Sequence, residues 1–298
     1  MPRRSASRSR RRRPGRRRRR GGRRPRLLSI GSIASAALPS RRTRRRWRRG
    51  WRSAPRALRW PVALLALGAL WLGVNGVYQV IRKPSELFFP ISGALHKSPA
   101  QTWRAYGPLF RRHSTDLITP HLLAALAQVE GAGNPLARTY WRWSLSMDPF
   151  DLYRPASSSV GMYQISDGTF AEARRYCIHD HEVVAQGPWH DWRSCWLNFL
   201  YIRILPSHAI ELTAAHLDRH AKRALRLHPV PGATQRARQE LAALIHLCGA
   251  GAGRAHARRG LELPPGLRCG SHDVRRYLRK VATAQARFGQ LESADSSR

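Results

Sequence analysis

The sequence predicts a mostly α-helical protein with one membrane-spanning helix and a disordered, arginine-rich amino-terminal arm. Three observations lead to this fold class. Residues 1–59 contain 25 Arg and no Lys, Asp or Glu; residues 60–81 contain no charged side chain; and apolar side chains recur at helical spacing over much of the remaining sequence. The length of 298 residues suits one sizeable domain with extensions.

The amino-terminal arm, residues 1–59, combines this charge with Pro, Gly and Ser, so we expect it to be disordered and self-repelling. Residues 60–298 hold 29 basic and 17 acidic residues, a formal net charge of +12. A polybasic arm can bind the phosphates of nucleic acid or anionic lipid head groups. We favour contact with anionic lipid head groups and a role as a topology signal, and expect no specific nucleic acid partner.

The apolar segment that follows predicts a transmembrane helix over residues 60–82. Its 22 uncharged residues are interrupted only by Asn75 and Gln79, and they suffice to cross about 30 Å of hydrocarbon. A cleaved signal peptide is the alternative, but the apolar run exceeds the usual length of about 7–15 residues and no small-x-small site clearly follows it. Because arginines crowd the amino-terminal flank, the positive-inside rule keeps the arm cytoplasmic and exports residues 83–298.

Four cysteines lie on the exported side, where thiols oxidise, and their even number predicts two disulfides with three possible pairings. Nearest-neighbour pairing, Cys177 with Cys195 and Cys248 with Cys269, closes two loops of similar size, each worth about 3 kcal/mol. Zinc is the competing hypothesis, because three histidines lie between the first two cysteines. The sequence has no CxxC or HExxH spacing to support it, so we expect no metal and no other cofactor.

Within the exported part, residues 83–97 read as a tether, residues 98–288 as one helical domain, and residues 289–298 as a flexible tail. Arg138 to Ser158 has no clear period and is expected to be an irregular loop or a short hairpin, so that at most a small β element lies near 140–165. The expected helices begin near Pro99 and Pro120 and then cover 166–177, 192–204, 209–227 and 235–248, with Ser271 capping the last one.

Glu130 is the strongest candidate for chemistry. It ends an apolar helical stretch, and a general acid must hold its proton near pH 7. The apolar neighbours Leu126 and Val129 favour the protonated form, and so do the unpaired carbonyls at a helix carboxyl end. Alone, such a residue is more often an ordinary solvated glutamate. A second, glycine-centred segment 31 residues further on strengthens the hypothesis.

That second segment is a polar turn around Gly161, where a backbone without Cβ permits close approach of a ligand. Ser159 and Gln164 offer donors and acceptors for hydroxyl and acetamido groups. Trp141 and Trp143 of the preceding insertion could stack on sugar rings or, being at alternate positions, pack one face of a hairpin. Tyr140 of the same insertion is a further candidate for substrate binding. The complete expected substrate-binding set is Tyr140, Trp141, Ser159, Gly161, Met162, Tyr163 and Gln164.

These segments resemble the soluble-type lytic transglycosylases over roughly residues 98–288. The catalytic-helix motif is similar to Ala127-Gln128-Val129-Glu130 with Asn134-Pro135 and Ala137, and the second motif to Val160-Gly161-Met162-Tyr163-Gln164-Ile165 with Thr169. The third and fourth motifs are similar to Gly249-Ala250-Gly251 and to Arg276-Tyr277-Leu278-x-Lys280-Val281.

The resemblance implies a lysozyme-like transglycosylase domain that binds peptidoglycan glycan strands and cleaves the MurNAc–GlcNAc β-1,4 bond without water. Glu130 would act as acid and then as base, giving 1,6-anhydroMurNAc. It also implies a protein of the bacterial inner membrane with a periplasmic carboxyl-terminal domain. Two alternatives stay open: a hydrolytic muramidase, for which Asp148 and Asp151 are the possible second acids, and a non-catalytic wall-binding or assembly module on the same fold.

The sequence departs from the family pattern in three places. Gly131 stands where the family usually has Ser after the catalytic Glu, and Cys248-Gly249 stands where it usually has Tyr-Asn. The insertion between the first two motifs is also longer than usual. Two hydroxyl groups of the family pattern, one from the serine and one from the tyrosine, are therefore missing. Tyr163 or Tyr140 is the candidate to replace the tyrosine.

Overall fold

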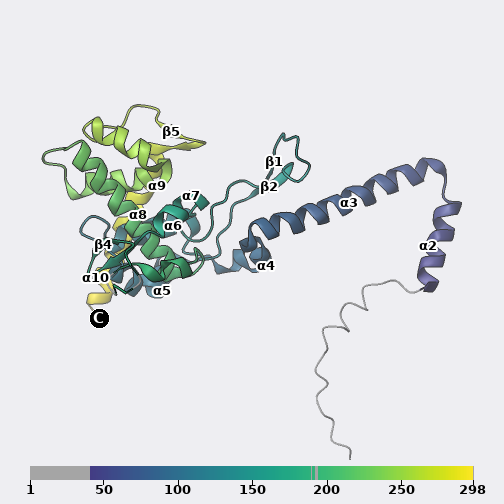
Figure 1. Cartoon of the computed structure of the whole chain (residues 1–298), viewed down its shortest axis with the longest axis horizontal. Helices are drawn as coiled ribbons and strands as arrows, with labels where there is room; N and C mark the ends of the chain where they lie inside the picture. Colours follow the sequence, from purple (N-terminus) through teal and green to yellow (C-terminus); the bar gives the residue numbers. More distant parts are fainter. Residues whose placement is uncertain (1–40, 189, 192–193, 298) are drawn as a thin grey trace, which may run out of the picture. The chain divides into compact units, whose positions relative to one another are not determined.

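The computed structural model describes residues 41–188, 190–191 and 194–297. The described residues divide into two units after Gly68, and Figure 1 shows their helices and strands. The predicted disorder of the arm lies outside the described residues as far as residue 40. From there the prediction is wrong, because Arg41–Ser53 forms helix α2 and α3 begins at Arg56. Arginine has a high intrinsic helix propensity, which a reading by charge alone overlooks.

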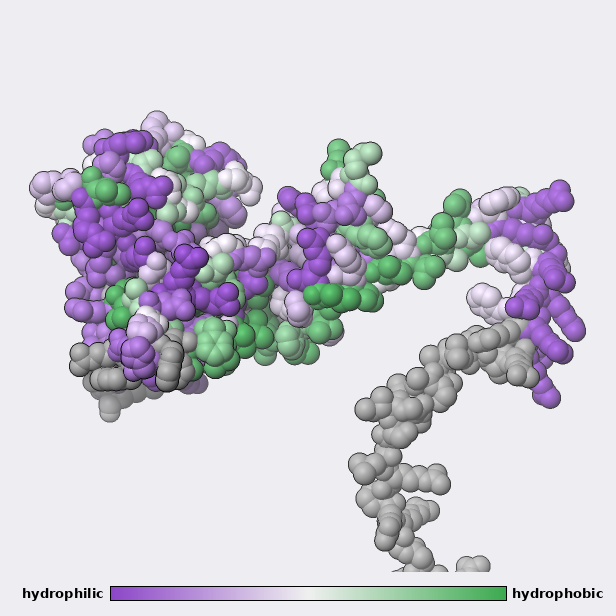
Figure 2. All heavy atoms as spheres, viewed as in Figure 1, coloured by the Kyte–Doolittle hydropathy of each residue, from purple (hydrophilic) through white to green (hydrophobic). Residues whose placement is uncertain are grey.

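Helix α3, Arg56–Arg82, contains the predicted transmembrane segment and is long and apolar enough to cross a membrane. Its apolar side chains are exposed along the helix, whereas arginines cover α2 (Figure 2). The two polar residues in its second half are buried. Asn75 Nδ2 donates to the carbonyl oxygen of Tyr153 at 2.6 Å, and Gln79 Nε2 donates to that of Phe150 at 2.6 Å. Each of these side-chain amides thus has a hydrogen-bond partner in the 138–158 insertion.

The segment expected as a tether forms three short helical turns, η1 Pro84–Phe88, α4 Phe89–Ser92 and η2 Gly93–Leu95. It packs on the helical domain. The Glu86 carboxylate is buried, and the Lys97 amide donates to the carbonyl oxygen of Ala132 at 2.8 Å, just beyond the end of α6.

The second unit is mostly helical, as predicted. Its remaining helices are α5 Pro99–Arg112, α6 Pro120–Gly131, α7 Asp167–Ala173, η3 Trp196–Leu200, α8 Pro206–Leu227, α9 Gln235–Arg258 and α10 Val274–Ser296. Helix α6 packs against α5, α8 and α10, and α8 packs against α9. Six consecutive residues, Leu122–Ala127, are fully or almost fully buried, so α6 lies at the centre of the hydrophobic core.

The described residues of this unit also form three antiparallel two-stranded sheets. They pair β1 Trp141–Trp143 with β2 Tyr153–Pro155, β3 Tyr176–His179 with β4 Glu182–Ala185, and β5 Arg268–Cys269 with β6 His272–Asp273. The first confirms the expected short hairpin. The second replaces the end of a helix predicted to run to Cys177. Asp180 and His181, between β3 and β4, both have positive φ, the conformation of a type I′ hairpin turn.

Both disulfides follow the nearest-neighbour pairing. Cys177–Cys195 and Cys248–Cys269 each have a Cα–Cα separation of 5.5 Å. The first links strand β3 to Cys195, the residue directly before η3. The helix η3 itself is far shorter than the helix predicted over 192–204. The second joins α9 to the β5–β6 hairpin. Disulfides are typical of proteins in an oxidising compartment, which agrees with export.

Two further predicted helix boundaries are wrong. The stop at Gly249 is a kink, because this residue has φ +81° and ψ 168° while the helix resumes and continues to Arg258. The last helix is capped by Asp273, whose carboxylate accepts from the Arg276 amide at 2.7 Å, and not by Ser271. A glycine can leave and re-enter helical geometry without a Cβ clash, which makes such boundaries hard to read.

Candidate active site

Glu130 lies in the last turn of α6, as expected. Thr119 caps the start of this helix by accepting from the Leu122 amide, and Pro120 occupies the first helical position. The helix ends at Ala132 in the left-handed conformation. The Glu130 side chain is 19% exposed, and its Oε1 lies 3.7 Å from Nε2 of His246. The Glu130 carboxylate is therefore partly buried but accessible to solvent, and it lies at the carboxyl end of α6, where the helix dipole is negative.

A tyrosine hydroxyl does lie beside Glu130, and it comes from α10. Tyr277 Oη donates to Glu130 Oε1 at 2.7 Å. Burial raises the pKa of the Tyr277 phenol well above its usual range, and the Glu130 charge and this hydrogen bond act in the same direction. The phenol therefore stays protonated and remains a donor. Tyr277 fills the place for which Tyr163 and Tyr140 were the sequence candidates.

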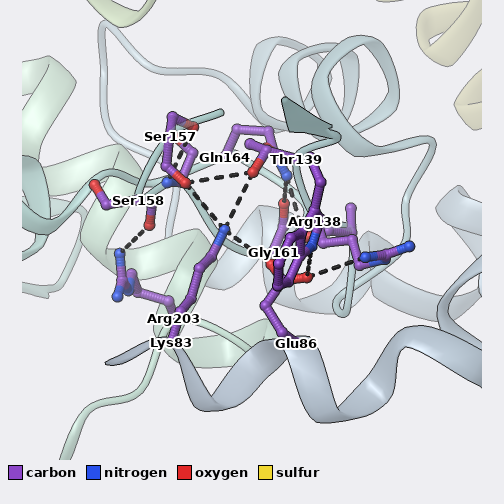
Figure 3. A network of polar contacts seen from close by, with 12 residues as sticks. Lys83, Glu86, Arg138, Thr139, Ser157, Ser158, Gly161, Gln164 and Arg203 are labelled. Atoms are coloured by element: carbon purple, nitrogen blue, oxygen red, sulfur yellow. Dashed lines mark hydrogen bonds and ion pairs between the residues drawn. The ribbon is translucent and has the colours of Figure 1, made fainter. Parts of the chain in front are cut away.

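The turn around Gly161 is held by one arginine (Figure 3). The Arg203 guanidinium donates to the carbonyl oxygens of Ser158 at 3.0 Å and Ile165 at 2.9 Å, and it pairs with Asp167 at 2.8 Å. Gly161 has φ +80°, and a Cβ there would lie 2.6 Å from the carbonyl oxygen of Arg203. The glycine is thus required by the protein's own backbone at this turn.

Gln164 closes the same turn from inside. Its Nε2 donates to the carbonyl oxygens of Gly161 at 2.9 Å and Ala137 at 3.2 Å. The residue adopts a left-handed backbone with φ 49°. Both amide hydrogens are thereby directed to the backbone, while the side chain still lines the cleft next to Glu130. Its carbonyl oxygen is the group left to accept from a ligand.

Met162 and Tyr163 do not reach the cleft, in contrast to their place in the expected binding set. Both side chains are fully buried, and Tyr163 Oη donates to the carbonyl oxygen of Leu123 in the middle of α6. Burial raises the pKa of the Tyr163 phenol well above its usual range. These two residues fasten the turn to α6 and so position it relative to Glu130.

The packing also explains Gly131. A Cβ at this position would lie 2.8 Å from both Cα and the carbonyl oxygen of Met162. The residue after the acid is therefore in direct contact with the backbone of the turn, and this spacing leaves no room for a serine side chain.

Glu130 lines a cleft with a volume of about 680 Å³. Of the expected residues, Tyr140, Ser159 and Gln164 line it together with Glu130, and His216 and His246 line it as well. Trp141 does not line this cleft. Among the described residues that do, Glu130 is the sole carboxylate. A cleft lined by one carboxylate, the Tyr140 phenol, the Gln164 amide and several hydroxyl groups suits a polar, hydroxyl-rich ligand.

Trp141 instead belongs to a set of polar contacts that we call the Glu86 network, formed by Lys83, Glu86, Arg138 and Trp141. Figure 3 shows Lys83, Glu86 and Arg138 of this network. Glu86 pairs with Lys83 at 3.2 Å and with Arg138 at 3.0 Å, and it accepts from the Trp141 indole at 2.9 Å. The carboxylate is 1% exposed. Burial lowers the pKa of Lys83, although the Glu86 carboxylate acts in the opposite direction.

The two acids considered for a hydrolase are engaged outside the cleft. The Asp148 carboxylate accepts from the amide of Phe150 at 2.8 Å. Asp151 pairs with Arg82 at 3.4 Å and with Arg154 at 3.2 Å. Neither residue is among the described ones that line the cleft of Glu130.

Sequence reasoning missed the two side chains that lie against the Glu130 carboxylate, Tyr277 and His246. Tyr277 lies within the segment that resembles the family's fourth motif, so its sequence carried a usable signal. His246 had none, because it is one histidine on the buried side of a helical pattern. Comparison of the chain with protein-family models gives no match, and a search of curated proteins also finds none.

Proposed function

We propose that the protein is a membrane-anchored lytic transglycosylase that cleaves the MurNAc–GlcNAc bond of peptidoglycan. The observation that carries the proposal is Glu130: a single carboxylate that faces a polar cleft and accepts a hydrogen bond from a phenol. The resemblance of the segments around Glu130, Gly161 and Tyr277 to the transglycosylase motifs supports the same reaction.

The reaction needs only one carboxyl group. Protonated Glu130 gives its proton to the glycosidic oxygen as the C1–O bond breaks, and the MurNAc 6-hydroxyl attacks C1. The hydroxyl proton passes to the Glu130 carboxylate, which restores the acid. Tyr277 stabilises the carboxylate form between these two proton transfers, because a hydrogen bond to a charged acceptor is stronger than one to a neutral acceptor.

A hydrolytic muramidase of the ordinary kind uses two carboxylates, one on each side of the bond. The pairing of Asp148 and Asp151 with groups outside the cleft supports the single-acid reaction over this alternative.

The membrane helix and the two disulfides support an anchored, extracytoplasmic protein. We place it in the bacterial inner membrane with the carboxyl-terminal domain in the periplasm. The arginines of α2 then lie on the cytoplasmic side, where they meet anionic lipid head groups.

The test is digestion of purified sacculi by the full-length protein in detergent, beside the Glu130→Gln variant. The wild type is expected to release 1,6-anhydromuropeptides and the variant to release none, with unchanged thermal unfolding. Full activity of Glu130→Gln sinks the proposal. Sacculus binding without any product from the wild type identifies a non-catalytic wall-binding module.

A further inference from the structure

A second cluster of chemically active side chains lies where α7 packs on α8. Glu172 belongs to α7, which follows the Gly161 turn, and His216 and His220 belong to α8. Residues four apart in a helix lie on the same face, one turn from each other. The two imidazoles therefore project together toward the helix that carries the carboxylate.

The three side chains are close enough to share one ion. One ligand atom from each, a ring nitrogen of the two histidines and a carboxylate oxygen, lies within 4.8 Å of the others. His220 Nε2 and Glu172 Oε1 are 2.9 Å apart, and the His216 and His220 ring centroids are 4.4 Å apart at an angle of 65°. A bound zinc ion would need side-chain rotations that bring the three atoms to about 2 Å from a common centre, the distance of Zn–N and Zn–O bonds.

The two histidines are buried, and one of them has a ring nitrogen without a hydrogen-bond partner among the described residues. His216 is 9% exposed and His220 is 8% exposed. The buried Nδ1 of His216 has no hydrogen-bond partner among the described residues, and an unmet buried polar atom is destabilising.

We propose that Glu172, His216 and His220 bind a divalent transition-metal ion, with zinc the ion that fits two imidazoles and one carboxylate best. Three protein ligands leave a fourth tetrahedral position for water. Because His216 also lines the cleft, the ion lies at the edge of the cleft that contains Glu130. Its first effect is to fasten α7, and with it the Gly161 turn, to α8. The site differs from the metal-free expectation of the sequence and does not depend on glycan cleavage.

Zinc hypotheses based on the cysteines do not apply here, since all four form disulfides. The spacing His216-x-x-x-His220 is the usable sequence signal, because it places two imidazoles on one helical face. The third ligand comes from 44 residues earlier in the chain, which no local pattern reveals. The Arg219 guanidinium, which lies over the Tyr176 ring at 4.1 Å, acts electrostatically on both histidines, and its positive charge opposes the binding of a cation.

The experiment is a zinc titration of the full-length protein in detergent, without a polyhistidine tag and after dialysis against EDTA and then buffer. Isothermal titration with ZnCl₂, checked by metal analysis, is expected to give one ion per chain. His216→Ala and His220→Ala are each expected to weaken binding at least about tenfold. His228→Ala, at the end of the same helix, is the matched control and should bind as the wild type does.

A mild variant keeps the test decisive if the buried histidine substitutions unfold the protein. The Glu172 side chain is 42% exposed, so Glu172→Gln should fold. Zinc is expected to raise the Tm of the wild type and of His228→Ala, since an ion that binds only the folded state stabilises it, and to raise that of Glu172→Gln much less. Absence of stoichiometric binding by the wild type, or equal binding by Glu172→Gln, overturns the proposal. Glycan cleavage plays no part in either readout.

Discussion

The Glu86 network and the surroundings of Glu130 place similar carboxylates in opposite conditions. Glu86 is 1% exposed and has two cations and an indole N–H as partners. Glu130 is 19% exposed, accepts one phenol hydrogen bond and has a histidine nitrogen at 3.7 Å. The Glu86 carboxylate is paired with two positively charged side chains, whereas the Glu130 carboxylate faces the cleft.

The difference separates a structural acid from the acid that we propose for the chemistry. Removing the Glu86 carboxylate takes the charged partner away from Lys83 and Arg138. The Glu130 carboxylate, with one neutral donor, lies in a cleft where a ligand can reach it. Substitution at the two positions should therefore affect different measured quantities.

Glu130→Gln should produce the largest effect in the molecule. Loss of the acid and base is expected to lower the rate of sacculus digestion about 10³-fold, or ~4 kcal/mol in the barrier. The free energy of unfolding should change by less than about 0.5 kcal/mol, because the side chain is partly exposed. Product release measured by chromatography and unfolding measured by denaturant titration check both parts. A large loss of stability in Glu130→Gln would contradict the distinction between Glu130 and Glu86, because Glu130 would then also be needed for the fold.

Glu86→Gln should show the reverse. The change leaves Lys83 and Arg138 facing a neutral amide, and we expect the protein to lose about 3 kcal/mol of stability. Activity per folded molecule should be retained. Thermal unfolding followed by circular dichroism, with activity assayed well below the transition, measures the two separately. Loss of activity in fully folded protein would mean that the network also shapes the cleft.

Gly131→Ser tests the contact between the acid's helix and the Gly161 turn. The new side chain would meet the Met162 backbone, and overpacking of this kind costs about 2 kcal/mol. Gly168→Ser is the matched control, because an added Cβ there meets nothing within 4 Å. Comparison of the two variants by denaturant unfolding checks the prediction. Equal stability of both would show that the turn gives way and that serine is tolerated after Glu130.

Tyr277→Phe should have the smallest effect. Removing the hydroxyl takes away one hydrogen bond to Glu130, and we expect activity to fall about tenfold, or ~1.4 kcal/mol. Tyr163→Phe is the control, because it removes a buried hydroxyl that bonds to Leu123 and not to Glu130. Initial rates normalised to folded protein distinguish them. Equal rates for the two variants would show that the Tyr277 hydroxyl does not contribute to the reaction through Glu130.

The sequence could predict those parts of the site that depend only on residues close together in the chain. Glu130 at a helix end, the capped helix after Ser166 and the turn at Gly161 each depend on neighbouring residues. The partners of Glu130 could not be derived in the same way, because Tyr277 lies 147 residues away and meets it only when α10 packs on α6.

The same distinction explains the other differences from prediction. The β3–β4 hairpin is fixed by a turn with two positive-φ residues and a disulfide, which outweigh helical periodicity up to Cys177. Met162 and Tyr163 are adjacent to a glycine turn in sequence, yet both face the core. Adjacency in a motif therefore did not reveal which side chains face the cleft.

The most direct test of a single-acid, water-free reaction is digestion of sacculi by the full-length protein in H₂¹⁸O, followed by mass spectrometry of the products. If the MurNAc 6-hydroxyl is the nucleophile, the products contain 1,6-anhydroMurNAc and no ¹⁸O. Reducing-end MurNAc that carries one ¹⁸O would contradict the account, because it would show that water attacks C1 and that Glu130 does not act alone.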